Sequence, residues 1–314
     1  MGQYYYSFSA YLKDKFPGQR VYKIALDAGF SCPHRTKDLR LGGCIYCENK
    51  SFSPNARLEP RPSVSEQIRS GMDFYRRRYQ AEKFMAYFQA YTNTYAPPDQ
   101  LKKIYDEIAE FKDVVGLSIG TRPDCVPDET LDLITSYTDR YLVWLEYGLQ
   151  SKHDRTLKFI RRGHNYESFV DAVKRTQGRN ISICAHIILG LPGETKQDMV
   201  ETVQAITDLN IDGIKLHNLY VSKNTSLEQL YQKGEIKLLT FEEYVPLLCD
   251  LLELLPPKMV VQRVTGELAG EYLVAPKWEV NKGQIIRAIE IELKRRNTYQ
   301  GHGYHNPVIN RIPE

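Results

Sequence analysis

The chain has 314 residues, enough for one large domain or two smaller domains with sizeable cores. It is 42% hydrophobic and 26% charged, as in ordinary globular proteins, and its net charge of +3 does not favour a general RNA-binding protein. No apolar run approaches the length of a membrane span, so we expect a cytoplasmic protein with no membrane partner.

Apolar, β-prone segments alternate with amphipathic segments along most of the chain. This pattern predicts strands at 20–29, 83–94, 113–121, 140–151, 180–193 and 212–221. It predicts helices after them at 65–80, 98–111, 127–137, 166–176, 194–209 and 226–235. Capping-box patterns at Ser63–Glu66 and Thr195–Asp198 indicate where two of these helices begin.

Six strand–helix units with nearly continuous apolar strands predict an α/β fold with a parallel sheet covered by helices. A doubly wound open sheet and a full or partial β/α barrel both fit this pattern, and spacing alone does not choose between them. In either fold, polar residues at the C-terminal ends of the strands form the expected site.

Polar side chains follow the apolar strands at those ends. The two-residue period of a strand puts Glu146 and Gln150 on one face of 140–151, His186 on one face of 180–193, and Lys215 with His217 on one face of 212–221. The simpler interpretation of each residue taken alone is a hydrogen-bonded core residue, or a residue on the solvent side of an edge strand. Together they predict a ligand-filled interior, since charged residues are rarely buried without a partner.

The loop after the first strand, "CPHRTKDLRLGGCIYC", holds Cys32, Cys44 and Cys47, three of the six cysteines of the chain. A redox dithiol would use two of them and leave Cys32 without a role. Zinc would accept the three thiolates with His34. A [4Fe–4S] cluster on three thiolates would keep one iron open for a ligand. The loop alone leaves the zinc and the iron–sulfur interpretations open.

Four segments in chain order resemble the radical S-adenosylmethionine (radical SAM) superfamily: this loop with Tyr46 before its last cysteine, "SIGTRPDC", "GLQS" followed by "RRGH", and "IILGLPGET". Two further segments, "YFQAYTNTYAP" and "QRVTGELAGEYLVAPKW", are similar to the YhcC/YtqA type of the Elp3-like branch. The resemblance covers nearly the whole chain.

The resemblance implies a partial (β/α)6 TIM-like barrel with a C-terminal α/β extension. We expect an N-terminal cap segment at 1–19, the barrel at 20–239, and the extension and tail at 240–314.

The resemblance also implies the chemistry. Cys32, Cys44 and Cys47 would hold a [4Fe–4S] cluster, and SAM would chelate its fourth iron. Reductive cleavage of SAM would give methionine and a 5′-deoxyadenosyl radical that abstracts hydrogen from the substrate. A low-potential donor such as a flavodoxin or ferredoxin would supply the electron.

Residue roles follow from motif positions within this resemblance. Tyr46 would pack near the adenine of SAM, Gln150 would bind the ribose, and Arg162 would pair with the carboxylate. The other expected SAM-binding residues are Gln89, Tyr91, Asn93, Thr94, Glu146, His186, Gly190, Leu191 and Pro192. Relatives often carry Asp in the place of His186, and a glycine-rich turn in the place of residues 90–94.

The substrate would be a small molecule or an RNA base, and its candidate contacts are Lys215, His217, Asn218 and Cys125. Cys184 and Cys249 lie in apolar runs, which predicts buried packing thiols. Two alternatives remain at this stage. One is a non-catalytic iron–sulfur or zinc protein, and the other is an RNA-binding protein with a vestigial barrel.

Overall fold

The computed structural model describes residues 4–35, 42–266, 268 and 270–304. Seven parallel strands form its main sheet, in the order β1-β2-β3-β4-β5-β6-β8. Their bounds are β1 Val21–Leu26, β2 Lys83–Phe88, β3 Val114–Thr121, β4 Leu142–Gln150, β5 Ser182–Leu189, β6 Gly213–Asn218 and β8 Val260–Arg263. A short antiparallel pair joins β7 Val221–Ser222 to β9 Leu273–Ala275.

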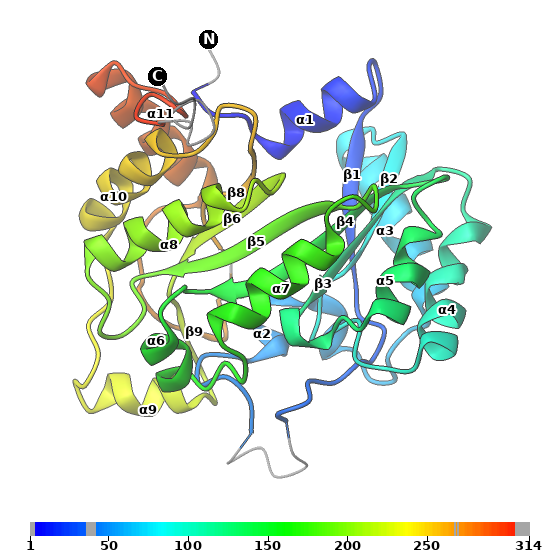
Figure 1. Cartoon of the computed structure of the whole chain (residues 1–314), viewed down its shortest axis with the longest axis horizontal. Coiled ribbons are helices and arrows are strands. Elements are labelled where there is room, and N and C mark those ends of the chain that lie inside the picture. Colours follow the sequence, from blue (N-terminus) through cyan, green and yellow to red (C-terminus); the bar gives the residue numbers. More distant parts are fainter. Residues whose placement is uncertain (1–3, 36–41, 267, 269, 305–314) are drawn as a thin grey trace, which may run out of the picture.

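The order of the strands distinguishes the two predicted closures. A doubly wound sheet reverses its strand order at a switch point, whereas here the order follows the chain throughout. The sheet is curled, and β1 and β8 are its two edges in the part of the chain that the structure describes (Figure 1). The fold is therefore an open half-barrel. The parallel α/β prediction is confirmed, and the partial barrel is the correct alternative.

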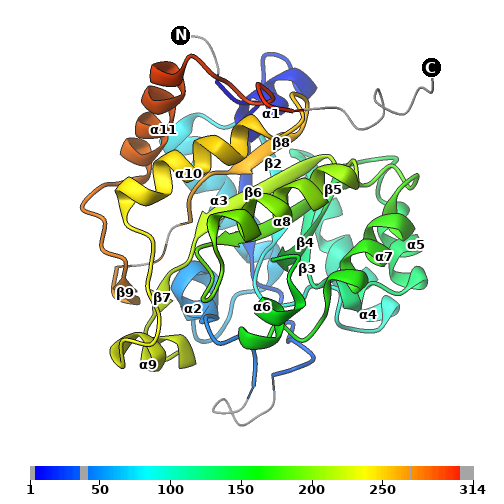
Figure 2. The same ribbon diagram turned by 60° about the vertical axis from the view of Figure 1, so that its left-hand side comes forward.

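Helices cover the convex face of the sheet and its ends (Figures 1 and 2). The α-helices are α1 Phe8–Lys15, α2 Asn49–Phe52, α3 Val64–Tyr79, α4 Pro98–Asp106, α5 Asp128–Thr135, α6 Asp154–Phe159, α7 Tyr166–Thr176, α8 Lys196–Asp208, α9 Ser226–Gln232, α10 Phe241–Glu253 and α11 Lys282–Arg296. Three 3-10 turns lie at Pro54–Arg57, Glu107–Glu110 and Pro123–Cys125. Both predicted capping boxes, at the starts of α3 and α8, are present with their reciprocal hydrogen bonds.

The interior of the half-barrel is apolar at one end and polar at the other. On β4 the side chains that face inward are Trp144, then Glu146, then Gln150 toward the C-terminal end. Trp144 is fully buried in a cluster with Tyr11 of α1, and α1 closes this end of the barrel. The polar side chains Glu146 and Gln150 therefore lie toward the opposite end of the barrel, where the strands have their C-terminal ends.

The C-terminal region contributes to both the sheet and its cover. β8 lies within the predicted 240–314 extension, yet it pairs with β6 and completes the sheet. Helices α10 and α11 pack against each other beside it. Cys184 and Cys249 are fully buried, which confirms that they pack in the core. The division into 1–19, 20–239 and 240–314 stays a prediction.

Within the ranges that the structure describes, no helix has the length and the apolar character that a bilayer crossing requires.

Candidate functional site

One cavity collects side chains from the cysteine loop, from the ends of the strands and from β8. Its lining includes most of the residues that the sequence singled out, namely Cys32, Cys44, Tyr46, Cys47, Gln89, Tyr91, Glu146, Gln150, Arg162, His186, His217 and Asn218. These residues come together because parallel strands end at the same edge of the sheet. The predicted polar interior is therefore a real cavity at the C-terminal ends of the strands.

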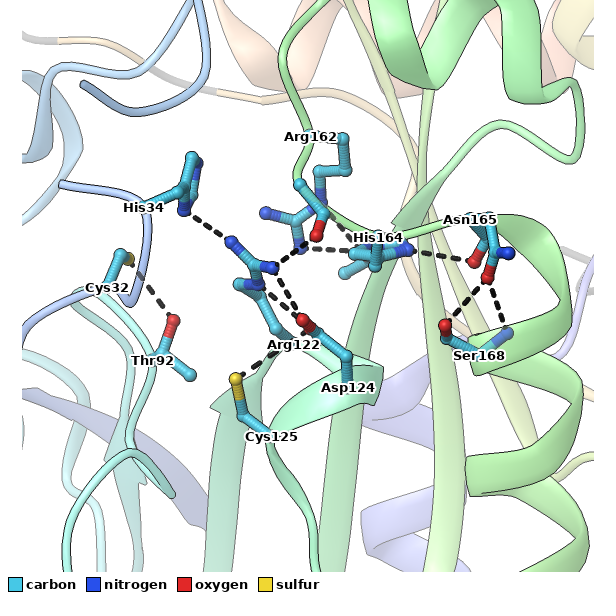
Figure 3. Close-up of polar contacts among 12 residues, drawn as sticks. Cys32, His34, Thr92, Arg122, Asp124, Cys125, Arg162, His164, Asn165 and Ser168 are labelled. Carbon is cyan, nitrogen blue, oxygen red and sulfur yellow. Dashed lines mark hydrogen bonds and ion pairs between the residues drawn. The ribbon is translucent and has the colours of Figure 1, made fainter. Parts of the chain in front are cut away.

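The three loop cysteines all face this cavity, and each sulfur has a polar neighbour. Thr92 Oγ1 lies 3.2 Å from Cys32 Sγ, a contact marked by a dashed line in Figure 3. Asn49 Nδ2 lies 3.6 Å from Cys47 Sγ. Arg162 Nη1 lies 3.6 Å from Cys44 Sγ. Such donors stabilise negative charge on sulfur, which is the form that binds metals.

The thiols differ in how readily they ionise. Burial alone would raise the pKa of Cys44, but the Arg162 guanidinium and His34 lower it to about 6. Burial and the neighbouring Cys44 raise the pKa of Cys47 to about 12, and burial also raises the pKa of Cys32. Without a metal, one thiolate forms easily and its charge opposes ionisation of the others. No three His, Cys, Asp or Glu side chains of the described chain are grouped to hold one metal ion.

Arg122, which sequence reasoning missed, holds the cysteine loop through a contact with His34. Figure 3 shows it between His34 and Asp124, and its Nη2 lies 2.6 Å from Asp124 Oδ2 and 2.8 Å from the Gly163 carbonyl oxygen. Arg122 Nη1 also contacts Nδ1 of His34. Arginine only donates, so Nδ1 accepts and the His34 Nε2–H points to Cys44 Sγ, 3.5 Å away. Arg122 lies in the quoted "SIGTRPDC" segment, which was the available signal.

Arg162 and Gln150 form a polar cradle next to Cys44. The Arg162 Nε and Nη2 atoms donate to the Gly148 carbonyl oxygen at 3.0 and 2.5 Å. A Cβ at position 148 would lie 2.3 Å from Arg162 Nη2, so only glycine leaves room for this arrangement. Gln150 has a left-handed φ of 79°, and its buried Oε1 has no hydrogen-bond partner in the described part of the chain. An unpaired buried acceptor indicates a ligand donor at this place.

The turn after β2 divides into lining and supporting residues. Gln89, Tyr91 and Thr92 line the cavity. Asn93 is fully buried and donates to the carbonyl oxygens of Phe88 and Gly120, at 3.1 and 2.8 Å. Thr94 donates to the Cys125 carbonyl oxygen at 2.5 Å. Asn93 and Thr94 are therefore not brought to the cavity lining; they hold the turn that carries their neighbours.

Glu146 is the centre of a charged cluster in the barrel interior. Its carboxylate accepts from Lys23 Nζ at 2.6 Å, from His186 Nε2 at 2.8 Å, and from Lys215 Nζ. Burial alone would raise the pKa of Glu146, but the Lys215 and Lys23 ammonium groups lower it well below its usual range. Burial lowers the pKa of Lys215 to about 7 and that of His186 to about 3. Glu146 is thus ionised and His186 neutral at neutral pH.

The predicted substrate contacts fall into two groups. His217 and Asn218, at the end of β6, line the cavity, together with Arg263 of β8, which sequence reasoning missed because β8 itself was not predicted. Lys215 is buried below the lining, with its Nζ 3.1 Å from the Tyr87 hydroxyl. Cys125 is buried beside Asp124 and is not brought to the lining.

The "GLPG" turn also lies apart from the cavity lining. Gly190, Leu191 and Pro192 line a separate depression with residues 235–239. Gly190 has a φ of 80°, and a side chain there would collide with Leu239. In the structure this turn therefore supports the segment before α10, and contact of its backbone with SAM stays a prediction.

The fold and the site agree with comparisons to known proteins. Residues 32–206 match the family described as "Radical SAM superfamily", and residues 211–295 match "Radical_SAM C-terminal domain". The chain is 39% identical to YtqA of Bacillus subtilis over 300 residues, which is 95% of this chain and 92% of that protein. It is 36% identical to YhcC of Escherichia coli over 84% of both chains.

Among solved structures, the Elp3 of the archaeon Methanocaldococcus infernus is similar, with a TM-score of 0.70 at 17% identity. The match covers 90% of this chain and 64% of the Elp3 chain. At this identity the likeness concerns the fold alone, and it supports the half-barrel described above.

Proposed function

The chain belongs to the radical SAM superfamily, in its Elp3-like, YhcC/YtqA-type branch, and from this premise we propose that it cleaves SAM reductively. We propose that Cys32, Cys44 and Cys47 hold a [4Fe–4S] cluster. When bound, the cluster would pass one electron to SAM, giving methionine and a 5′-deoxyadenosyl radical for hydrogen abstraction. The electron would come from a low-potential flavodoxin or ferredoxin.

The cysteine loop offers ligands for such a cluster, whose thiolates bind separate irons, so the described thiols do not have to converge on one metal ion. Three thiols face one cavity, and no fourth cysteine lines it among the described residues, so a cluster held here keeps one iron for SAM. The thiol with the lowered pKa, Cys44, is ready to bind as a thiolate. Donors from Thr92, Asn49 and Arg162 lie near the sulfurs, and such contacts tune the potential of a cluster.

One observation carries the proposal most directly. Arg162 connects the Cys44 sulfur to the Gly148 carbonyl, two residues from the unpaired Oε1 of Gln150. Of the five N–H groups of Arg162, two remain after its contacts with Gly148 and Cys44 and suit the SAM carboxylate, and the Gln150 oxygen can accept a ribose hydroxyl. Tyr46 would pack on the adenine, and Gln89, Tyr91 and Thr92 would meet the amino end. The three thiols and the cradle of Arg162 and Gln150 thus line the same cavity.

The test is an anaerobic assay of the reconstituted protein with iron, sulfide, dithionite and SAM, followed by chromatography of 5′-deoxyadenosine. We expect the native protein to form it. We expect the Cys44→Ala variant to lose it by about 100-fold or more, because the cluster loses a ligand. The matched control is Cys249→Ala, which removes a buried thiol of α10 outside the cavity lining. Equal product from native protein and the Cys44→Ala variant would contradict the proposal.

A further inference from the structure

The edge of the cavity formed by β6, β7 and β8 contains buried polar atoms that have no hydrogen-bond partner among the described residues. Asn218, at the end of β6, is 1% exposed, and neither Oδ1 nor Nδ2 has a hydrogen-bond partner among the described residues. Ser222 is also 1% exposed, and its Oγ likewise has no partner there. Both side chains line the cavity. Because buried polar groups are normally hydrogen-bonded, these atoms indicate a polar ligand.

The same edge has positive charge that no carboxylate of the described residues matches. Arg263 lines the cavity, and the structure records no ion pair or hydrogen bond from its side chain to any described residue. Among the described lining residues the one carboxylate is Glu146, and Lys23 and Lys215 already share it. The lining arginine Arg122 is paired with Asp124. Arg263 is half-buried, and in a cavity where solvent access is restricted a cation without a counter-charge attracts an anion.

The other two arginines of the lining belong to the cysteine end. Arg162 contacts Cys44 Sγ, and Arg35 donates to the Cys47 carbonyl oxygen at 2.8 Å. The cysteine loop follows β1, whereas Arg263 lies on β8, and these strands are the two edges of the sheet. The unmatched charge of Arg263 therefore belongs to a different part of the cavity from the thiols.

His217 adds an acceptor next to this charge. Its Nδ1 lies 3.3 Å from the Asn218 carbonyl oxygen, which can only accept, so the proton resides on Nδ1 and leaves Nε2 as an acceptor. Burial, followed by the charge of Arg263, lowers the pKa of His217 to about 4, which keeps the ring neutral. Gly266 brings the chain after β8 close to the base of this side chain, since a Cβ there would lie 3.5 Å from His217 Cβ.

We propose that the substrate is a small acid whose carboxylate or phosphate group binds Arg263, and whose neighbouring hydroxyl or amino group binds Asn218 and His217. This inference rests on the proposed function for the reaction itself, and it adds the chemical class of the substrate. An uncharged base brings no counter-charge to Arg263, so an RNA substrate would have to supply one from its phosphates, and the net charge of +3 gives no general support for RNA binding. The small acid is therefore favoured over the RNA base.

The experiment measures binding by calorimetry with the reconstituted protein in the presence of SAM, under anaerobic conditions. The probes are inorganic phosphate and L-lactate, with uncharged lactamide as the control ligand. We expect the native protein to bind at least one anion about tenfold or more tightly than lactamide, since a charged hydrogen bond is lost with the amide. The stronger of the two anions identifies the phosphate or the carboxylate as the natural group.

Variants assign the binding to this edge. Arg263→Gln is expected to weaken the anion by about tenfold or more, and Arg263→Lys to restore part of the loss. Asn218→Ala tests the same edge without changing any charge, and it is also expected to weaken binding of the anion. Arg77→Gln, which removes an exposed arginine of α3, is the matched control and should change nothing. Equal binding of lactate and lactamide, or no anion binding that depends on Arg263, would overturn the inference.

The result separates this inference from the proposed function, because iron content and 5′-deoxyadenosine are measured on the same samples. A protein that holds the cluster and cleaves SAM but binds neither anion contradicts the inference and leaves the proposed function standing. A protein that holds no cluster but binds an anion through Arg263 supports the anion site and contradicts the proposed function.

Discussion

At the residue scale, Gly148 shows how one missing side chain shapes the cradle. The Gly148 carbonyl accepts both Nε and Nη2 of Arg162, and this is possible because nothing occupies the Cβ position. The atoms that a Cβ would meet are Arg162 Nη2 at 2.3 Å and Gln150 Nε2 at 2.9 Å, the far ends of two side chains. A methyl group would therefore move the guanidinium and the amide, and the backbone would stay in place.

This gives a prediction for SAM binding. Gly148→Ala should keep the fold and the iron content but weaken SAM binding by about tenfold or more, because the carboxylate loses its charged hydrogen bonds. Equilibrium dialysis with labelled SAM measures the effect. Gly270→Ala is the matched control, since a Cβ there meets nothing within 4 Å. Unchanged SAM affinity in Gly148→Ala would show that Arg162 does not bind the ligand from this position.

At the element scale, the sequence predicts the long strands and helices better than the short ones. Apolar periods that extend over whole elements predict the six strand–helix units, and all six predicted strands are present as β1 to β6. β8 was missed because its four residues, Val260–Arg263, follow Pro256 and Pro257 and are too few to establish a period. Because β8 was not predicted, Arg263 was not predicted as a cavity residue either, since its position there depends on the pairing of β8 with β6.

The candidate site was predictable where a motif carried it and not where tertiary contacts did. The cysteines, Gln150 and Arg162 lie in motifs, and all of them line the cavity. Asn93 and Thr94 lie in the predicted SAM-binding turn, but their side chains satisfy backbone groups behind it. Nothing local in the sequence distinguishes these two from Thr92, because the difference is the direction in which each side chain points.

The C-terminal helices give a prediction at this scale. Ile289 of α11 is fully buried in the main core, whereas Ile291 on the same helix is 57% exposed. Ile289→Ala should lower the free energy of unfolding by about 2–5 kcal/mol, because it leaves a cavity in the core. Ile291→Ala should change it by about 0.5 kcal/mol or less. Urea unfolding followed by circular dichroism measures both, and equal effects would mean that α11 is not docked as described.

At the scale of the whole molecule, the half-barrel buries charged side chains around Glu146, and the histidines buried with them are neutral at neutral pH. Burial lowers the pKa of His186 to about 3, and that of His164 and His217 to about 4. In the unfolded chain these histidines have the ordinary pKa of 6.5. The unfolded state therefore binds more protons between these values, and stability is fully present above pH 6.5 and is lost as the pH falls toward 4.

The corresponding prediction concerns acid unfolding. The free energy of unfolding should fall between about pH 6.5 and 4, and the contribution of His217 alone should be roughly 2–3 kcal/mol at the acid end. His217→Gln should make the pH dependence shallower in urea unfolding at a series of pH values. His302→Gln, at an exposed histidine, is the control and should leave the slope unchanged. The same slope in native protein and His217→Gln would contradict the assigned burial.

The central claim is that three cysteines hold a cluster whose open iron receives SAM beside Arg162. The most direct measurement is electron paramagnetic resonance of the dithionite-reduced, reconstituted protein, recorded with and without SAM. We predict a cluster signal whose shape changes when SAM is added. Arg162→Gln should require about tenfold more SAM for that change. Arg161→Gln, at the exposed neighbouring arginine, should behave as the native protein. A cluster signal that SAM does not alter, or a loop that binds zinc and forms no cluster, would contradict the claim.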